Sequence, residues 1–322
     1  MSEERPKLAV LARVPAAVLA ALRARAGLVD LSGEPRERWE PALGDADGLL
    51  VNSGVPVDAA LIAQAPAARI VATVSVGYDN VDLAALRERG IALTNSRGSL
   101  DEAVADLTYA LVILGMRRLG RALNWVRDGR WMKAEAPFGT DLEGAVLGII
   151  GFGGIGPKIA RRAFASGMRV IYSNRHPRDD DDRTGASYRS FDALLAEADC
   201  VVVLVPLSPR TRGMFDDAAF AKMKPTAVFV NVARGAIADT AALLRALDGG
   251  TIAGAALDVT DPEPLPPDHP LQGRDDVLIT PHVGSATDQT RTRMAMLAAQ
   301  NLLAFLDGAP LLTPVPLEGP PA

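Results

Sequence analysis

Short apolar runs alternate with helical patterns along the first third of the chain. Strands are predicted at Leu8–Leu11, Gly48–Val51 and Ile70–Thr73, with a helix over Asp58–Gln64 between the last two. A further helical pattern over Val81–Arg89 ends at a glycine, which is a normal stop signal. Strands separated by helices of this length predict βαβ units and a mostly parallel sheet.

A second alternation follows a helical pattern over Leu100–Leu119, which is predicted to connect two domains. Helices fit between most of its predicted strands, which are Val146–Ile150, Arg169–Tyr172, Val201–Val205, Ala227–Val230, Ile252–Leu257 and Val277–Thr280. Thr290–Asp307 is again helical and is predicted to pack back on the first domain. The predicted fold class is α/β with two doubly wound parallel-sheet domains, one of residues 1–99 plus 287–322 and one of residues 100–286.

Composition and charge exclude several classes of function. The chain has 322 residues, 48% hydrophobic and 23% charged, as in an ordinary globular protein of about two domains. Its net charge of −5 favours neither nucleic acid nor an anionic membrane as a partner. The one local acidic run, Asp179–Asp182, is predicted to be a solvated loop.

Nothing in the sequence predicts secretion or membrane insertion. The single cysteine, Cys200, lies in an apolar run and is expected in the core rather than as a nucleophile. The N-terminal segment is charged, and no apolar run approaches the roughly 18 residues that span a bilayer. The expectation is a cytoplasmic protein.

The segment 151–156, GFGGIG, follows an apolar strand and opens a helical pattern, which is the context of a dinucleotide-binding loop. Gly151 permits a tight turn, Gly153 lets the pyrophosphate approach, and Gly156 allows close contact between helix and strand. N–H groups at the helix start then face the pyrophosphate, and Pro157 suits a first-turn position. The alternative is a glycine turn that binds no ligand.

The residues that follow the next predicted strand bear on the choice of cofactor. An NAD site usually carries Asp or Glu at this point to hold the ribose 2′-hydroxyl, but this chain has Ser173, Asn174 and Arg175. A hydroxyl, an amide and a guanidinium favour a 2′-phosphate, so NADP(H) is the preferred cofactor and NAD(H) the second. Arg178 would add positive charge, whereas Asp179–Asp182 would oppose it if they folded close. Alternatively, Arg175 stacks on adenine and the site accepts both cofactors.

Arg234, Glu263 and His282 supply the side chains that reduction of a 2-keto acid needs. A guanidinium holds the substrate carboxylate through two parallel hydrogen bonds. An imidazole gives a proton to the forming alkoxide, and a carboxylate orients the imidazole and favours its charged form. Of the three histidines, His176 belongs to the expected adenine end and His269 to a turn. His282 instead follows a predicted strand at its carboxyl end, where open α/β sheets bind ligands.

Several blocks of sequence carry a family resemblance that covers essentially the whole chain. They are Gly151–Gly156, Val205–Leu207 with Thr211 and Arg212, Asn231–Gly235, Leu257–Val259, Pro262–Leu271 and Thr280–Thr287. The chain resembles the D-isomer-specific 2-hydroxyacid dehydrogenases and is most similar to their glyoxylate/hydroxypyruvate reductase branch. The resemblance implies a Rossmann coenzyme domain inserted in a flavodoxin-like substrate domain. It also implies NAD(P)H-dependent reduction of small 2-keto acids, glyoxylate and hydroxypyruvate, to D-2-hydroxy acids.

The resemblance implies a role for each matching residue of the substrate site. Arg234 binds the carboxylate and the C2 carbonyl, and the backbone N–H groups of Val76 and Gly77 also hold the carboxylate. His282 is the acid in reduction and the base in oxidation, and Glu263 hydrogen-bonds its far nitrogen. A substrate entering between the two domains would be sequestered from water as they close.

Further positions match contacts of the family. Ser285 matches a substrate contact, Asp258 a contact to the nicotinamide carboxamide, and Thr108 a contact near the nicotinamide. The implied cofactor-binding set also contains Gly151, Phe152, Gly153, Gly154, Ile155, Gly156, Ser173, Asn174, Arg175, Val205, Pro206, Thr211, Val232, Ala233, His282 and Gly284. No metal is implied.

Simpler interpretations stay open for several of these residues. Arg234 would then form an interdomain salt bridge, and Glu263 would be a solvated residue of a proline-rich loop. Asp258 would cap a strand, and His282 would be a structural histidine. Trp131 matches the first tryptophan of the family's connector, but the second, which lines the substrate pocket in some relatives, is absent. Substrate choice is therefore open.

Other functions are compatible with the same sequence motifs. D-lactate and phosphoglycerate dehydrogenases are the alternatives within the family, although the length leaves no room for a C-terminal regulatory domain. A nucleotide-sensing protein similar to the corepressors of the family is the alternative from another class. The expected partners are a small 2-keto or 2-hydroxy acid and, through the coenzyme domain, a second copy of the chain. Leu100–Leu119 with Arg121–Arg130 would supply that homodimer interface.

Overall fold

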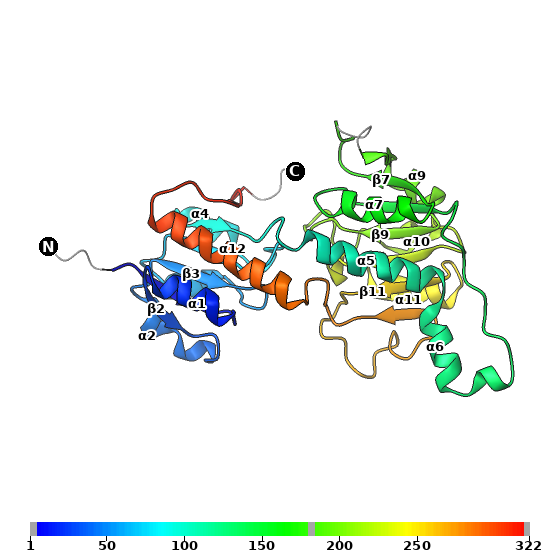
Figure 1. Cartoon of the computed structure of the whole chain (residues 1–322), viewed down its shortest axis with the longest axis horizontal. Helices are drawn as coiled ribbons and strands as arrows, with labels where there is room; N and C mark the ends of the chain where they lie inside the picture. The colour runs from blue at the N-terminus through cyan, green and yellow to red at the C-terminus, as the bar shows by residue number, and fades with distance from the viewer. Residues whose placement is uncertain (1–4, 180–183, 319–322) are drawn as a thin grey trace. The chain divides into compact units, whose positions relative to one another are not determined.

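The computed structural model describes residues 5–179 and 184–318 (Figure 1). The chain divides into two compact units, one of Met1–Leu100 with Thr287–Ala322 and one of Asp101–Ala286. Of the acidic run that was predicted to be a solvated loop, residues 180–182 lie outside the described part, and the exposed Asp179 lies within it.

The first unit is built on a five-stranded parallel sheet with the order β2–β1–β3–β4–β5. Its strands are β1 (Lys7–Val10), β2 (Gly27–Asp30), β3 (Gly48–Val51), β4 (Ile70–Thr73) and β5 (Ala92–Thr94). This is the flavodoxin-like order. Every residue of β3 and β4 is buried, which accounts for their unbroken apolar sequences GLLV and IVAT.

The helices of the first unit cover this sheet. They are α1 (Ala16–Arg23), α2 (Glu40–Leu43), α3 (Ala59–Gln64), α4 (Leu83–Glu88) and α12 (Asp288–Leu306). The C-terminal helix α12 packs against α1 and against β3 and β4 (Figure 1), as the helical pattern in this segment predicted. Ser96 links α12 to the sheet, because its hydroxyl oxygen lies 3.1 Å from Met294 O and 3.0 Å from Thr73 O and can donate its proton to either.

The second unit is built on a seven-stranded parallel sheet with the order β12–β11–β10–β9–β6–β7–β8. Its strands are β6 (Val146–Ile150), β7 (Arg169–Ser173), β8 (Ser187–Tyr188), β9 (Cys200–Val203), β10 (Val228–Asn231), β11 (Gly254–Leu257) and β12 (Val277–Ile279). This is a Rossmann order, and the chain reverses direction across the sheet at β6. Open α/β sheets bind ligands at such a switch point, beyond the carboxyl ends of the strands.

The helices of the second unit are α5 (Asp101–Met116), α6 (Leu119–Arg127), α7 (Gly156–Ala165), α9 (Phe191–Glu197), α10 (Asp217–Ala221) and α11 (Thr240–Asp248). Three of them, α9, α10 and α11, begin at a residue whose side chain caps the first turn. Asp216 and Asp239 cap α10 and α11, because their side chains accept hydrogen bonds from N–H groups of the first turn.

Cys200 is the first residue of the buried strand β9, and burial raises the pKa of its thiol. Its prediction as a core residue is confirmed.

One predicted element is wrong. The helical pattern over Leu100–Leu119 predicted a single helix, but α5 ends at Met116 and α6 begins at Leu119. Arg118 has a φ of 51°, in the left-handed region, and this conformation breaks the helix. Neither glycine nor proline stands at 117–119 to mark the break in the sequence.

The expected fold class, two doubly wound parallel-sheet domains of flavodoxin-like and Rossmann order, is confirmed. Among helices in residues 5–179 and 184–318, none combines the length and apolar character that a membrane span requires. The same residues contain no cluster of three or more His, Cys, Asp or Glu side chains suited to a metal ion.

Candidate active site

The turn between β6 and α7 is open on the side where a pyrophosphate would lie. Gly151 has a φ of 94°, and a Cβ there would stand 2.8 Å from the backbone nitrogen of Val205. A Cβ on Gly153 would meet no atom of the described residues within 4 Å. α7 then begins at Gly156 with Pro157 in its first turn. The loop and the helix N-terminus fit the phosphates of a dinucleotide.

Phe152 anchors this loop in the core. Its ring is 1% exposed and stacks on Tyr172 with 4.6 Å between centroids. A Cβ on Gly156 would stand 2.6 Å from the same ring. Gly156 therefore makes room for the ring of Phe152 within the loop.

Asn174 fastens the glycine loop to the end of β7. Its Oδ1 accepts a hydrogen bond from the N–H of Phe152 at 2.6 Å, and its Nδ2 donates to Phe152 O at 3.4 Å. Arg178 donates from Nη1 to the same carbonyl at 3.0 Å. Ser173 is buried and Arg175 is exposed. Of the three residues expected at the ribose, Asn174 is thus engaged by the loop, and Arg175 is the exposed cation.

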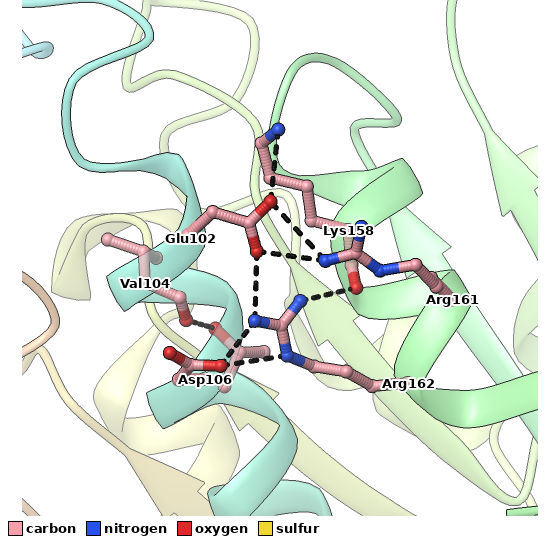
Figure 2. A network of polar contacts seen from close by, with 7 residues as sticks. Glu102, Val104, Asp106, Lys158, Arg161 and Arg162 are labelled. Atoms are coloured by element: carbon pink, nitrogen blue, oxygen red, sulfur yellow. Dashed lines mark hydrogen bonds and ion pairs between the residues drawn. The ribbon is translucent and has the colours of Figure 1, made fainter. Parts of the chain in front are cut away.

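An ion-pair network joins the first two turns of α5 to α7 (Figure 2). Glu102 lies 2.9 Å from Arg162, 3.1 Å from Arg161 and 3.5 Å from Lys158. Arg162 pairs with Asp106 as well. The hydrogen bond from Arg162, with the positive charges of Arg161 and Lys158, holds the pKa of Glu102 below its ordinary value. The network thereby secures the helix that follows the glycine loop.

Two predicted cofactor contacts have hydroxyls that are bonded locally. Thr108 on α5 is fully buried and donates to Val104 O at 2.6 Å. Thr211, in the loop after β9, donates to Pro206 O at 2.6 Å and accepts from the N–H of Ser208 at 2.8 Å. Thr211 therefore closes the loop that also carries Val205 and Pro206.

The register of the sheet brings the three loops that carry the candidate catalytic residues to one edge. Asn231 of β10 pairs with Leu257 of β11, and Leu257 pairs with Ile279 of β12. The loops that carry Arg234, Glu263 and His282 leave from these three strand ends. Parallel strands direct their carboxyl ends to the same edge, which is also the edge of the glycine loop.

Asn231 shapes the loop that carries Arg234. It is 1% exposed, its Nδ2 donates to Arg234 O at 2.9 Å, and its Oδ1 accepts from the N–H of Ala233 at 3.0 Å. A Cβ on Gly235 would stand 2.0 Å from the backbone of Thr260, so only glycine fits there. Arg234 itself is half-buried, and its Nη1 donates to Ala233 O at 2.8 Å.

His282 and Glu263 meet beyond the ends of β11 and β12. Nδ1 of His282 lies 2.7 Å from Oε1 of Glu263. A carboxylate only accepts hydrogen bonds, so Nδ1 carries the proton of this contact and Nε2 is the nitrogen that faces other groups. The backbone of His282 has a φ of 53°. The arrangement is that of an oriented general acid or base.

Asp258, the residue after β11, is directed into the turn that carries His282. It is 2% exposed. Its Oδ1 accepts from the hydroxyl of Thr280 at 2.6 Å and from the N–H of Val283 at 2.8 Å, and its Oδ2 accepts from the N–H of Gly284 at 2.8 Å. Ser285 is half-buried and follows this turn.

In the first unit, two side chains orient the loop of Val76 and Gly77 after β4. Asn95 donates from Nδ2 to Val76 O at 2.9 Å, and the Ser75 hydroxyl donates to Gly77 O at 2.7 Å. In a planar trans peptide the N–H points opposite to the carbonyl. The bond from Asn95 therefore fixes the direction of the Gly77 N–H.

Sequence reasoning missed the polar residues that hold these loops. Asn231, Thr280, Asn95 and Ser75 each sit at or just beyond a strand end and bond the backbone or a buried carboxylate of a functional loop. The sequence signal that could have identified these residues is a polar residue at the end of an apolar run that predicts a strand.

Three comparisons bear on the identity of the chain. The family model of the D-isomer specific 2-hydroxyacid dehydrogenase NAD binding domain matches residues 109–284. The glyoxylate reductase of Aeropyrum pernix is 44% identical over 271 residues, which are 82% of this chain and 81% of that protein. The glyoxylate/hydroxypyruvate reductase B of Klebsiella pneumoniae is 43% identical over 284 residues, 87% of each chain.

A solved structure shares the fold over almost its full length. The NADPH-dependent glyoxylate/hydroxypyruvate reductase of Sinorhizobium meliloti, in complex with NADP and malonate, has a TM-score of 0.87 and 34% identity, with 97% of both chains covered. The resemblance that the motifs carry is confirmed. The chain belongs to the D-isomer-specific 2-hydroxyacid dehydrogenase family of nicotinamide-dependent oxidoreductases.

Proposed function

We propose that this enzyme reduces glyoxylate and hydroxypyruvate to the corresponding D-2-hydroxy acids with NADPH. The observation that carries the proposal is the 2.7 Å contact of His282 with Glu263, at the sheet edge that also bears the open glycine loop. The names of the relatives, glyoxylate reductase and glyoxylate/hydroxypyruvate reductase B, support these substrates. When bound, the reduced nicotinamide supplies the hydride.

In this proposal three side chains act on the keto acid. Arg234 binds the carboxylate through its two parallel N–H groups and thereby orients the C2 carbonyl. His282 donates the proton on Nε2 to the carbonyl oxygen as the alkoxide forms, and it accepts that proton in the reverse reaction. Glu263 keeps the imidazole oriented through Nδ1 and stabilises its positive charge.

We assign substrate binding to residues 1–99 plus 287–322 and cofactor binding to residues 100–286. In the first group, the N–H groups of Val76 and Gly77 bind the substrate carboxylate. Asn95 and Ser75 support this assignment because they engage the carbonyl oxygens of the same loop. Ser285 is the proposed further substrate contact.

We propose NADP(H) as the preferred cofactor and NAD(H) as the second. The end of β7 offers no carboxylate to a ribose 2′-hydroxyl, and Arg175 is exposed there to meet a 2′-phosphate. The S. meliloti structure, which contains NADP, supports this preference. The remaining proposed contacts are Thr108, Gly151, Phe152, Gly153, Gly154, Ile155, Gly156, Ser173, Asn174, Val205, Pro206, Thr211, Val232, Ala233, Asp258, His282 and Gly284.

The test is a set of initial rates of cofactor oxidation. Glyoxylate, hydroxypyruvate, pyruvate and 2-ketobutyrate are each assayed with NADPH and with NADH. Fast turnover of the first two with NADPH is expected. A preference for NADH would overturn the cofactor proposal and leave the chemistry standing, and turnover of pyruvate or 2-ketobutyrate alone would overturn the substrate proposal.

We also propose a homodimer formed through the second unit. The segment 119–138, which we call the arm, exposes apolar side chains. Leu123 and Val126 of α6 are each 57% exposed, and Met132 of η2 (Arg130–Met132) is 89% exposed. Arg130 holds the arm to its own unit, because its Nη1 donates to Oδ2 of Asp275 at 2.8 Å. Exposed apolar surface of this kind marks a protein interface.

Light scattering after size exclusion tests the dimer. Leu123→Glu with Val126→Glu is expected to yield monomers. Leu312→Glu is the matched control, since Leu312 is a 53% exposed leucine outside the arm. A double variant that remains dimeric would contradict the arm as the interface.

A further inference from the structure

We propose that Thr280 is a positioning residue which, through Asp258, sets the backbone turn of His282 and so the direction of its imidazole. The inference rests on the proposed function, in which His282 is the proton donor. Thr280 itself is not assigned a contact to substrate or cofactor.

The turn adopts a conformation that its sequence does not favour. In the described part of the chain, His282 and Arg118 are the two non-glycine residues with a positive φ. Histidine in the left-handed region is strained and persists when the surrounding structure over-determines it. The groups that bond this turn are therefore the ones that fix the position of the imidazole.

Most of the backbone bonds of this turn go to Asp258, although the N–H of His282 also lies 3.0 Å from the backbone carbonyl of Thr280. The backbone carbonyl of Asp258 accepts the N–H of His282 at 2.8 Å, and its carboxylate accepts the N–H groups of Val283 and Gly284, each at 2.8 Å. One buried residue thus bonds three consecutive N–H groups of the turn. The backbone is therefore hydrogen-bonded to Asp258 on both sides of the Cα atom of His282, which carries the imidazole.

Thr280 holds the carboxylate in the orientation that this pinning needs. Its hydroxyl donates to Oδ1 of Asp258 at 2.6 Å, and the next acceptor, Leu257 O, is 3.5 Å away. A carboxylate that is 2% exposed depends on such donors, because burial removes the solvation of its charge. Without the hydroxyl, Oδ1 loses the one side-chain donor that faces it, and the carboxylate is free to rotate away from the N–H of Val283.

The experiment compares Thr280→Val, which keeps the shape and removes the hydroxyl, with Thr280→Ser, which keeps the hydroxyl. Both are made in the wild-type enzyme and in Glu263→Ala, and kcat and KM are measured with hydroxypyruvate and NADPH. Thr280→Val is expected to lower kcat about tenfold, within the ~10²-fold that a small misplacement of a catalytic group costs. The dissociation constant of NADPH, from fluorescence titration, is expected to change much less than kcat, because Asp258 is one of many proposed cofactor contacts, and Thr280→Ser is expected to keep kcat near that of the wild type.

The Glu263→Ala background, which removes the acceptor of the His282 Nδ1–H group, separates positioning from a general structural role. If Thr280 acts by directing the imidazole to Glu263, its effect shrinks to less than about threefold once that partner is lost, because coupled residues are not additive. An equal loss in both backgrounds, or a Thr280→Val enzyme with wild-type kcat, would overturn the inference. If Thr280→Val does not fold, Thr280→Ala takes its place against the same Thr280→Ser control. His282→Ala with normal turnover would instead refute the proposed function, whatever Thr280 does.

Discussion

Glu263 and His282 join through a 2.7 Å contact between Oε1 and Nδ1, and their side chains remain 41% and 40% exposed. The pair therefore lies at the surface of its own unit, and solvent screens the charge of the carboxylate. Orientation of the ring, rather than burial of an ion pair, is the main contribution of Glu263. In the proposed reaction, Nε2 is then the ring nitrogen that exchanges the proton with the substrate.

Replacing His282 by alanine is expected to lower kcat for glyoxylate reduction about 10²–10⁴-fold, the usual contribution of a positioned general acid. NADPH binding should change little. His269→Ala is the matched control, since His269 lies in a turn and its Nδ1 accepts the N–H of Leu271 at 3.2 Å. Steady-state kinetics check the result. Equal losses in the two variants would count against a proton-donor role.

Arg234→Lys keeps the positive charge and removes the planar fork. The loss of one charge-assisted hydrogen bond to the substrate carboxylate is expected to raise KM for the keto acid by about 10–100-fold. The KM for NADPH should stay within about twofold. Arg245→Lys is the control, because Arg245 forms a similar two-bond contact with Asp217 on an exposed surface. Unchanged KM for the keto acid in Arg234→Lys would place the substrate carboxylate elsewhere.

Arg175 and Arg178 are expected to affect the cofactors differently. Arg175→Ala removes an exposed cation and should weaken NADPH binding by about tenfold while sparing NADH, since only NADPH carries the 2′-phosphate. Arg178→Ala removes a bond to Phe152 O in the glycine loop and should weaken both cofactors. Fluorescence titration with each nucleotide measures this. A selective NADPH defect in Arg178→Ala with none in Arg175→Ala would reverse the two roles.

Glu102→Gln is expected to destabilise the second unit by less than about 1 kcal/mol at neutral pH, because its carboxylate is 48% exposed. The hydrogen bond from Arg162 lowers the pKa of Glu102 in the folded state. Its stabilisation is therefore present above the ordinary carboxyl pKa and is lost as the pH falls through the lowered value.

Thermal melts at neutral and acidic pH, at low and high salt, check this expectation for Glu102. The difference from wild type should vanish in acid and shrink in salt. Glu88→Gln on α4 is the control for neutralising an exposed glutamate. A stability difference that grows as the pH falls would contradict a lowered pKa for Glu102 in the folded state.

Much of the fold was predictable because buried parallel strands are apolar throughout. The bounds of β3, β4 and β6 follow directly from their apolar runs. β2, β5 and β8 were missed: β5 and β8 have three and two residues, too few to show a pattern, and no residue of the four in β2 is fully buried. Strands this short are recognised only through their pairing with a neighbour.

The sequence predicted the candidate catalytic side chains, but it did not predict the residues whose hydrogen bonds hold their loops in place. Arg234, Glu263 and His282 stand out because each must be a particular residue type. The hydrogen bonds that Asn231 and Thr280 donate could not be predicted in this way, because they depend on the conformation of the loop that follows each strand. The engagement of Asn174 by Phe152 was missed for the same reason.

That engagement of Asn174 limits how this enzyme can change cofactor. An amide meets both the N–H and the carbonyl of Phe152, at 2.6 and 3.4 Å, whereas a carboxylate at 174 accepts from the first and repels the second. Exchange of Asn174 for the aspartate of an NAD site would thus disturb the pyrophosphate loop along with the ribose. Under the proposed preference for NADP(H), a change toward NAD(H) would therefore require substitutions near Phe152 and Arg178 together with the one at position 174.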